Sequence, residues 1–117
     1  MANEISVGGS LTYSKNKAKA TLSGSFFATQ AGDKYQAGIQ SIGTTEESLD
    51  KGDVGTVGYL ALRNIDATNF VQFGSTTGVY SIKLLPGEFT VVPWQHASIF
   101  ALANTSAVEV EYLCVEA

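Results

Sequence analysis

His96 and Cys114 are the only histidine and the only cysteine of this 117-residue chain, so they are the first candidates for nucleophilic chemistry. A catalytic pair requires the thiol to lie within hydrogen-bond reach of the imidazole. Cys114 belongs to an apolar C-terminal stretch, and apolar surroundings raise the pKa of a thiol and make it inert. We therefore expect a core thiol and a loop histidine, and we predict no catalytic residues and no enzymatic activity.

The most polar stretch, residues 45–53, could gather carboxylate oxygens around a calcium ion. Its acidic residues are Glu46, Glu47, Asp50 and Asp53. The stretch lacks the D-x-D-x-D-G spacing of a calcium loop, and zinc needs about four ligands in close array. We expect a solvated loop, no metal and no cofactor. The competing interpretation is one helical turn over 44–49, in which Thr44 caps and Glu47 completes a capping box.

Three glycines, Gly52, Gly55 and Gly58, superficially resemble a phosphate-binding loop. Neither a Lys-Ser/Thr pair nor a helix start follows them, as such a loop requires. We expect these glycines to shape the entry into a strand.

Aromatic side chains could form a platform on which a sugar ring stacks. The candidates are Tyr35, Tyr59, Tyr80 and Trp94. Most of them are expected in the core. Tyr35 and Trp94 are the candidate glycan platform. Trp94, which follows Pro93 at a strand end, is the best candidate for partial exposure. Hydrolysis of a glycoside would also need two carboxylates facing one cleft.

Lysines at alternate positions, Lys15, Lys17 and Lys19, predict a strand with a basic face. Such a face is either a solvated edge that blunts uncontrolled strand pairing or a docking patch for an acidic surface. Residues 1–45 carry four lysines against two acids, whereas residues 46–117 carry three bases against nine acids. This polarity suits docking on a partner or on a second copy of the chain, so the three lysines are the candidate partner-binding residues.

Short segments of period-two alternation, separated by turn residues, predict strands throughout the chain. The last strand, 108–115, alternates apolar residues with glutamates until Leu113 and Val115 break its polar face; the apolar residues are Val108, Val110, Tyr112 and Cys114. Gly8 and Gly9 indicate a bulge or a close backbone approach in the first strand. Pro86 and Gly87 predict a turn that joins 79–85 and 88–92 in a hairpin. About eight strands without a long helical pattern predict an all-β fold: a single antiparallel β-sandwich domain, jelly-roll-like, over residues 1–117.

Composition and charge limit the classes of partner that we expect the chain to bind. The chain is 44% hydrophobic and 15% charged, which argues against disorder. Its net charge of −4 removes the basic footprint of a nucleic-acid-binding protein. No apolar run approaches the roughly 20 residues that span a bilayer, and the N-terminus lacks the pattern of a secretory signal. We expect no nucleic-acid or membrane partner and synthesis in the cytoplasm without a signal peptide.

Three blocks of the C-terminal half resemble small β-rich proteins encoded among the structural genes of tailed bacteriophages. They are Gly58-Tyr-Leu-Ala-Leu-Arg-Asn-Ile-Asp-Ala-Thr-Asn-Phe-Val-Gln-Phe-Gly74, Ile82-Lys-Leu-Leu-Pro-Gly-Glu88 and Glu109-Val-Glu-Tyr-Leu-Cys-Val-Glu116. Residues 1–50 show no such resemblance.

The resemblance implies a non-enzymatic virion structural protein, a capsid decoration or minor capsid protein that binds the assembled shell. Its partners would be the major capsid protein or other virion proteins, and the chain would form a homo-oligomer. The protein would be made in the cytoplasm of the host and located in the virion. The alternative is a carbohydrate- or receptor-binding module of a phage tail. An enzyme would require a cleft that gathers carboxylates such as Glu46 and Asp53.

Overall fold

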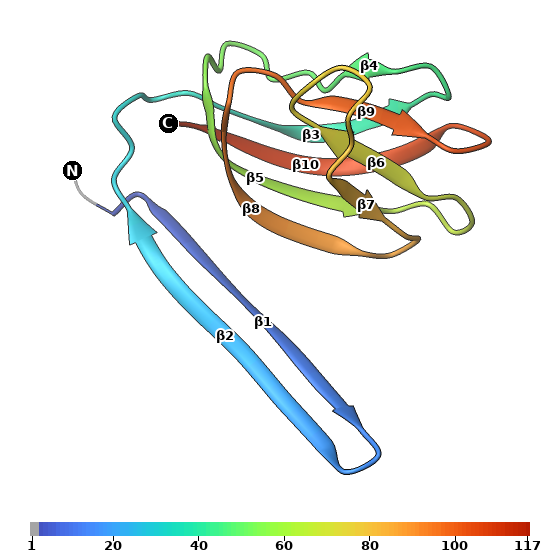
Figure 1. Cartoon of the computed structure of the whole chain (residues 1–117). Helices are drawn as coiled ribbons and strands as arrows, with labels where there is room; N and C mark the ends of the chain where they lie inside the picture. The colour runs from blue at the N-terminus through green and yellow to red at the C-terminus, as the bar shows by residue number, and fades with distance from the viewer. Residues whose placement is uncertain (1–2) are drawn as a thin grey trace. The chain divides into compact units, whose positions relative to one another are not determined.

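A computed structural model describes residues 3–117 and shows an all-β protein, as the sequence predicted (Figure 1). Met1 and Ala2, at the start of the stretch in which we expect no signal peptide, lie outside the described residues. Within the described part no helix is long and apolar enough to cross a membrane. Contacts divide the chain into two compact units, Met1–Ala31 and Gly32–Ala117.

Ten strands make up the two units. They are β1 (Ile5–Lys15), β2 (Ala18–Ala28), β3 (Tyr35–Ile42), β4 (Glu47–Ser48), β5 (Val57–Asn64), β6 (Val71–Gly74), β7 (Ile82–Leu84), β8 (Phe89–His96), β9 (Phe100–Ala103) and β10 (Val108–Glu116).

The first unit is a long antiparallel hairpin of β1 and β2. Asn16 and Lys17 connect the strands with φ angles of 50° and 73°, the left-handed conformation that a two-residue type I′ turn needs at both positions. The strand predicted to begin at Lys15 is therefore wrong, because the chain reverses within the lysine-rich segment. The bulge predicted at Gly8 and Gly9 is also wrong, since the register runs unbroken and pairs Gly9 with Gly24.

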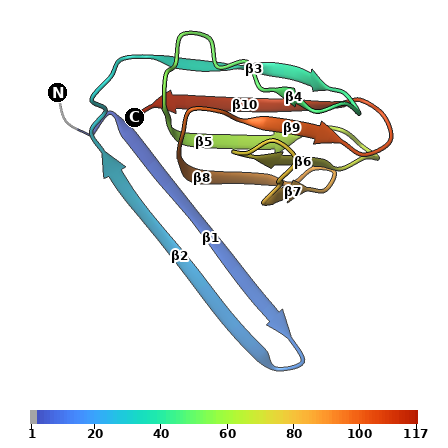
Figure 2. The ribbon, with the colours of Figure 1, turned by 45° about the horizontal axis from the view of Figure 1, so that its top comes forward.

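The second unit is a jelly roll of two four-stranded sheets, with strand orders β3-β10-β5-β8 and β4-β9-β6-β7 (Figure 2). Its antiparallel pairs are nested: the first strand pairs with the last, the second with the last but one, and so on to β6 and β7. This nesting is what a long antiparallel ribbon produces when it rolls up into two sheets. The jelly-roll sandwich predicted over 1–117 thus lies within the second unit, and the first two predicted strands form a separate sheet.

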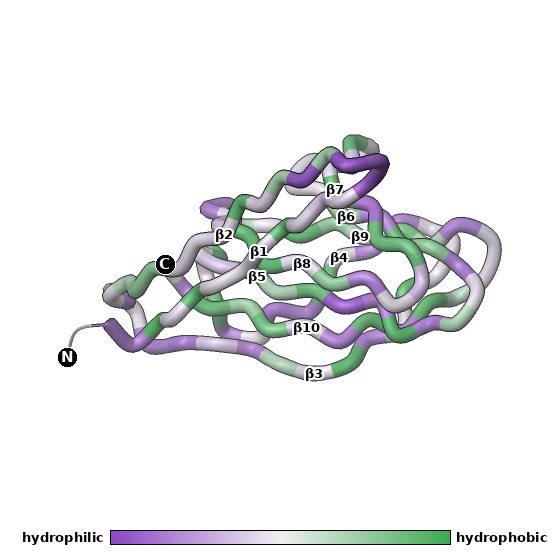
Figure 3. The backbone as a smooth tube through the Cα atoms, turned by 90° about the horizontal axis from the view of Figure 1, so that it is seen from below, coloured by the Kyte–Doolittle hydropathy of each residue, from purple (hydrophilic) through white to green (hydrophobic). Residues whose placement is uncertain are grey.

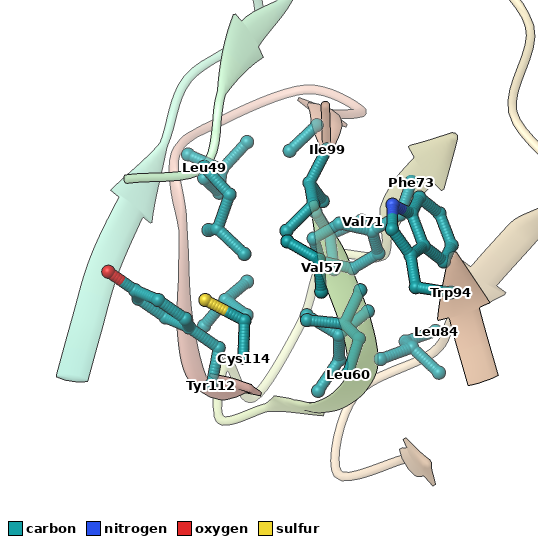
Figure 4. Packing of buried hydrophobic residues seen from close by; sticks show 14 of the residues in the cluster. Leu49, Val57, Leu60, Val71, Phe73, Leu84, Trp94, Ile99, Tyr112 and Cys114 are labelled. Carbon is teal, nitrogen blue, oxygen red and sulfur yellow. The ribbon is translucent and has the colours of Figure 1, made fainter. Parts of the chain in front are cut away.

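The side chains between the two sheets form one hydrophobic core (Figure 4). In β10, Val108, Val110, Tyr112 and Cys114 are buried while the glutamates between them are exposed, the alternation predicted for this strand. Figure 3 shows that β10 carries both hydrophobic and hydrophilic residues. Phe73 of the other sheet is fully buried. The predicted buried thiol of Cys114 is confirmed.

The turn at Pro86 and Gly87 forms as predicted, but it does not make a hairpin. Glu88 donates its N–H to the Leu85 carbonyl at 3.0 Å, and Gly87 has a φ of 81°. The strands on either side nevertheless enter different sheets, because β7 pairs with β6 and β8 pairs with β5. The predicted hairpin pairing is therefore wrong, since the turn carries the chain from one sheet to the other.

Asn64, at the end of β5, forms hydrogen bonds that stabilise the segment crossing from one sheet to the other. Its backbone N–H donates to the Glu88 carbonyl at 2.9 Å, and its own carbonyl accepts from Gly87 at 3.0 Å. Its side-chain amide donates to the carbonyls of Leu84 and Asn69, both at 3.0 Å. Because Asn64 is fully buried, these bonds satisfy polar groups that water cannot reach.

Asn64→Asp is expected to lower the free energy of unfolding by about 3 kcal/mol near neutral pH. The carboxylate cannot donate to the Leu84 and Asn69 carbonyls, and it places a charge where no water enters. The measurement is urea unfolding of the variant beside Asn104→Asp, a control at an exposed asparagine that should change stability little. Equal stability of the two variants would contradict the role given to Asn64.

Candidate docking surfaces

One face of the hairpin is apolar along its whole length. Residues paired across an antiparallel ladder point to the same side, so the register of the pairing places alternate residues of β1 and β2 on one surface. We call it the hairpin apolar face; its members are Ile5, Val7, Leu11, Tyr13, Ala18, Ala20, Leu22, Phe26 and Ala28. Leu11 and Leu22 are 75% and 79% exposed. Alternation of apolar residues in β1 was visible in the sequence, but not that β2 completes the same face.

The Gly9 and Gly24 pair interrupts the hairpin apolar face near its middle. A Cβ added at either glycine would meet nothing within 4 Å, so the backbone is open there. Nearer the turn, Leu11, Tyr13, Ala20 and Leu22, with Thr21, line a shallow hollow of about 180 Å³. An incoming side chain would therefore meet both a depression and an accessible backbone.

The three predicted partner-binding lysines gather at the turn of the hairpin but do not share one face. Lys15 pairs with Ala18 on the hairpin apolar face, Lys19 pairs with Ser14 on the opposite, polar face, and Lys17 occupies the turn. The basic strand face is therefore wrong. The lysines instead form a basic tip, defined as Lys15, Lys17 and Lys19.

A second apolar surface covers the outside of the β3-β10-β5-β8 sheet. Since Val108, Val110, Tyr112 and Cys114 point into the core, the residues between them and their paired neighbours point outward. We call this the outer sheet face; its apolar members are Tyr35, Ala37, Ile39, Tyr59, Ala61, Phe89, Val91, Pro93, Leu113 and Val115. Leu113 and Val115 interrupt the polar alternation of their strand, and that sequence signal marks this surface.

Charged residues border one end of the outer sheet face. Arg63 donates to Glu111 at 3.1 Å, and its guanidinium lies over the Phe89 ring, 5.5 Å from the centroid. Glu109 projects from the same side of β10 as Glu111. Antiparallel sheets that face water usually carry polar residues outside, so an outer face this apolar is typical of a covered surface.

Cys114 and His96, the two candidates for nucleophilic catalysis, lie in different surroundings. Cys114 is fully buried, and burial raises the pKa of its thiol above the usual range. His96 is exposed at the end of β8, where its ring meets the Trp94 ring edge-on, with the two ring centroids 5.8 Å apart. A buried, protonated thiol and a surface imidazole do not form an activated nucleophile.

The candidate glycan platform does not assemble. Trp94 is only 7% exposed, and its indole N–H donates to the Ser98 carbonyl at 2.9 Å, so the predicted partial exposure is wrong. Tyr35 is 70% exposed and lies on the outer sheet face. Tyr59 also points to that face, whereas Trp94 points into the core, so Tyr35 and Trp94 lie on opposite sides of one sheet.

The acidic stretch is held by hydrogen bonds of its own. Glu46 accepts from the Gly78 N–H at 2.8 Å and from the Tyr80 hydroxyl, and these donors lower the pKa of its carboxyl. Glu47 accepts from the Gly43 N–H at 3.0 Å. Residues 47–48 form β4, so the competing helical turn over 44–49 is wrong.

The remaining acids of this stretch do not converge either. Asp50 accepts from Gly52 at 2.9 Å, while Asp53 is exposed in the following turn. Residues 3–117 bring no three His, Cys, Asp or Glu side chains close enough to hold a metal ion.

The spaced glycines serve packing. Gly52 has a φ of 55°, and a Cβ there would lie 2.6 Å from the Gln36 side-chain oxygen. At Gly58, a Cβ would lie 2.8 Å from the Ala117 backbone. Glycine is thus favoured at position 52 by its left-handed backbone conformation, and at position 58 by the close approach of the C-terminal backbone.

Comparisons with protein-family models, with curated proteins and with solved structures find no match for this chain.

Lys17→Gly is expected to stabilise the hairpin, because the left-handed conformation costs a lysine about 1 kcal/mol and costs glycine almost nothing. Amide hydrogen exchange followed by NMR should show slower exchange along β1 and β2. Lys19→Gly removes the same charge from a strand position and should speed exchange. Faster exchange in Lys17→Gly would contradict the type I′ turn.

Glu46 should make stability depend on pH in the acid range. Its folded pKa lies below the usual 4.5 because Tyr80 and Gly78 donate to the ionised carboxyl. The stabilisation is complete above the unfolded pKa and is lost as the pH falls through the folded pKa. Urea unfolding between about pH 7 and about pH 3 should show a smaller acid loss for Glu46→Gln than for the wild type. Tyr80→Phe, which removes the stronger donor, should also reduce the loss. An unchanged acid loss in both variants would contradict this coupling.

Proposed function

We propose that this chain is a non-enzymatic virion structural protein, a capsid decoration or minor capsid protein that binds the assembled shell. The observation that carries the proposal is the hairpin, which combines a long exposed apolar face with a basic tip. Exposed apolar surfaces of this kind are typical of protein-protein contacts. The resemblance of the three C-terminal blocks to phage structural proteins directs the proposal to a virion.

The basic tip is the part of the hairpin that contacts the shell. Lys15, Lys17 and Lys19 project around one turn, and residues 1–31 contain only Glu4 as an opposing charge. An acidic patch repeated over a shell would attract such a tip. Many weak contacts made by a symmetric array of copies give high overall affinity without one strong contact.

The jelly roll is compatible with this role but does not select it. Jelly rolls occur in viral capsid proteins and in lectins, and one fold supports many functions. The alternative of a carbohydrate- or receptor-binding tail module depended on an exposed Trp94 beside Tyr35. Burial of Trp94 removes that support and leaves Tyr35 and Tyr59 as the candidate rings that share one surface, the outer sheet face.

The test is co-sedimentation of the purified chain with empty shells of the phage that encodes it. We expect the wild-type chain to sediment with the shells, and Lys17→Glu combined with Lys19→Glu to lower the bound fraction roughly tenfold, because two attractive charges become repulsive. Lys51→Glu combined with Lys83→Glu applies the same charge change outside the hairpin and should bind nearly as well as the wild type.

The outcomes separate the role from the surface. Absence of the wild-type chain from the sedimented shells, and from purified virions by mass spectrometry, would overturn the virion role. Equal binding by the tip variant and the control would overturn the assignment of the contact to the basic tip.

A further inference from the structure

The chain carries two sheet surfaces that are apolar on the outside, the hairpin apolar face and the outer sheet face. Each exposes large hydrophobic side chains. The hairpin apolar face exposes Leu11, Tyr13, Leu22 and Phe26 by 41–79%. On the outer sheet face, the exposed fractions of Tyr35, Ile39, Phe89 and Leu113 lie between 42% and 70%. A two-stranded hairpin is marginally stable in water unless its apolar side packs against something.

The two surfaces match in kind and in size. Sheets pack face to face about 10 Å apart, with alternate side chains interdigitating. The 11-residue strands of the hairpin span roughly 36 Å, and the strands of the outer sheet face span roughly 27 Å. The hairpin is two strands wide, so it fits on a surface of four strands. The open backbone at Gly9 and Gly24 offers space for a large side chain of the outer sheet face.

Their charges are complementary. Three lysines against Glu4 give residues 1–31 a net charge of +2, and the remaining residues carry −6 of the total of −4. Lys15 lies on the hairpin apolar face itself, next to Ala18. Glu109 and Glu111 lie on the outward side of β10. Docking the hairpin on the outer sheet face brings lysines toward glutamates and avoids like charges apart from Arg63.

We propose that the hairpin apolar face of one copy packs on the outer sheet face of a second copy, so that each copy gives one hairpin and receives one. One contact, two strands wide and limited to the roughly 27 Å length of the outer sheet face, covers a footprint of roughly 260 Å². Two contacts cover roughly 520 Å² of each copy, a size found among the smaller protein-protein interfaces. The assembly is therefore closed, because an open chain of contacts would leave apolar faces uncovered at its ends.

Two variants, each damaging one surface, test the pairing. Leu11→Asp with Leu22→Asp spoils the hairpin apolar face, and Tyr35→Asp with Ile39→Asp spoils the outer sheet face. Light scattering coupled to size-exclusion chromatography should give the wild type a multiple of the 12.3 kDa monomer mass and each variant alone the monomer mass. An equimolar mixture of the two variants retains one of the two contacts, because the intact hairpin of one meets the intact sheet of the other. Its mean mass should therefore lie between that of the monomer and that of the wild-type assembly.

Matched controls place the same charges elsewhere. Ser10→Asp with Ser23→Asp puts two carboxylates on the polar face of the hairpin, across one paired position. Val79→Asp alters a side chain that is 60% exposed, like Ile39, but lies outside both surfaces. Both controls should assemble as the wild type does. Circular dichroism and thermal unfolding should show that every variant retains the folded sandwich of the wild type.

Each outcome decides the proposal. A monomeric wild-type chain overturns it, including the case in which a hairpin covers its own sheet. A mixture that associates no more than either variant alone while the wild type assembles also overturns it, because hairpin-to-hairpin or sheet-to-sheet pairing then accounts for assembly. The proposal does not rest on the virion role: the mixture of apolar-face variants tests self-assembly without shells, and Lys17→Glu with Lys19→Glu tests shell binding once light scattering has shown the assembly state of that variant.

Discussion

Hydrogen bonding by one buried residue, Asn64, holds the segment in which this chain crosses from one sheet to the other. The residue ends β5, and its backbone and side chain together reach the segment that leaves β7 and enters β8. No other polar side chain in residues 3–117 is buried to the same degree. Without partners, its amide and the carbonyls it serves would oppose folding, since buried polar groups without hydrogen bonds are costly. The nested pairing of the jelly roll therefore depends on a polar contact inside an otherwise apolar core.

A second constraint comes from the surfaces that the core leaves uncovered. The sandwich buries the inner faces of both of its sheets, yet one outer face and one side of the hairpin are also apolar. Water disfavours such surfaces by about 25 cal/mol for each Å² exposed. Basic groups lie on the hairpin and acidic groups on the sandwich. In the proposed packing between copies, apolar contact and charge attraction would act in the same direction.

The sequence predicted what depends on local pattern and missed what depends on distant partners. Alternation in 108–115 indicated correctly which side chains of β10 face the core, because inside and outside alternate with period two. The turn at Pro86 and Gly87 was also correct, but turn chemistry cannot specify which sheet the next strand joins. Alternating lysines are compatible with one strand or with two strands around a turn, and the left-handed conformation of Asn16 and Lys17 decides between them.

The candidate surfaces divide in the same way. Alternation in β1 and the apolar interruptions at Leu113 and Val115 were visible in the sequence. Their significance needed the register, which joins residues of two strands or four strands into one surface. The position of Trp94 was missed because its burial depends on the Ser98 carbonyl, which accepts the indole N–H.

The burial of Cys114 has a practical consequence for chemistry on this molecule. The chain contains no other sulfhydryl group, and this one is sealed in the core between the sheets. Maleimides and mild oxidants react with accessible thiolates, so the native protein presents them with no target. A cysteine introduced on any exposed strand would be modified selectively, and fluorophores or spin labels could be attached at chosen points without first removing the natural residue.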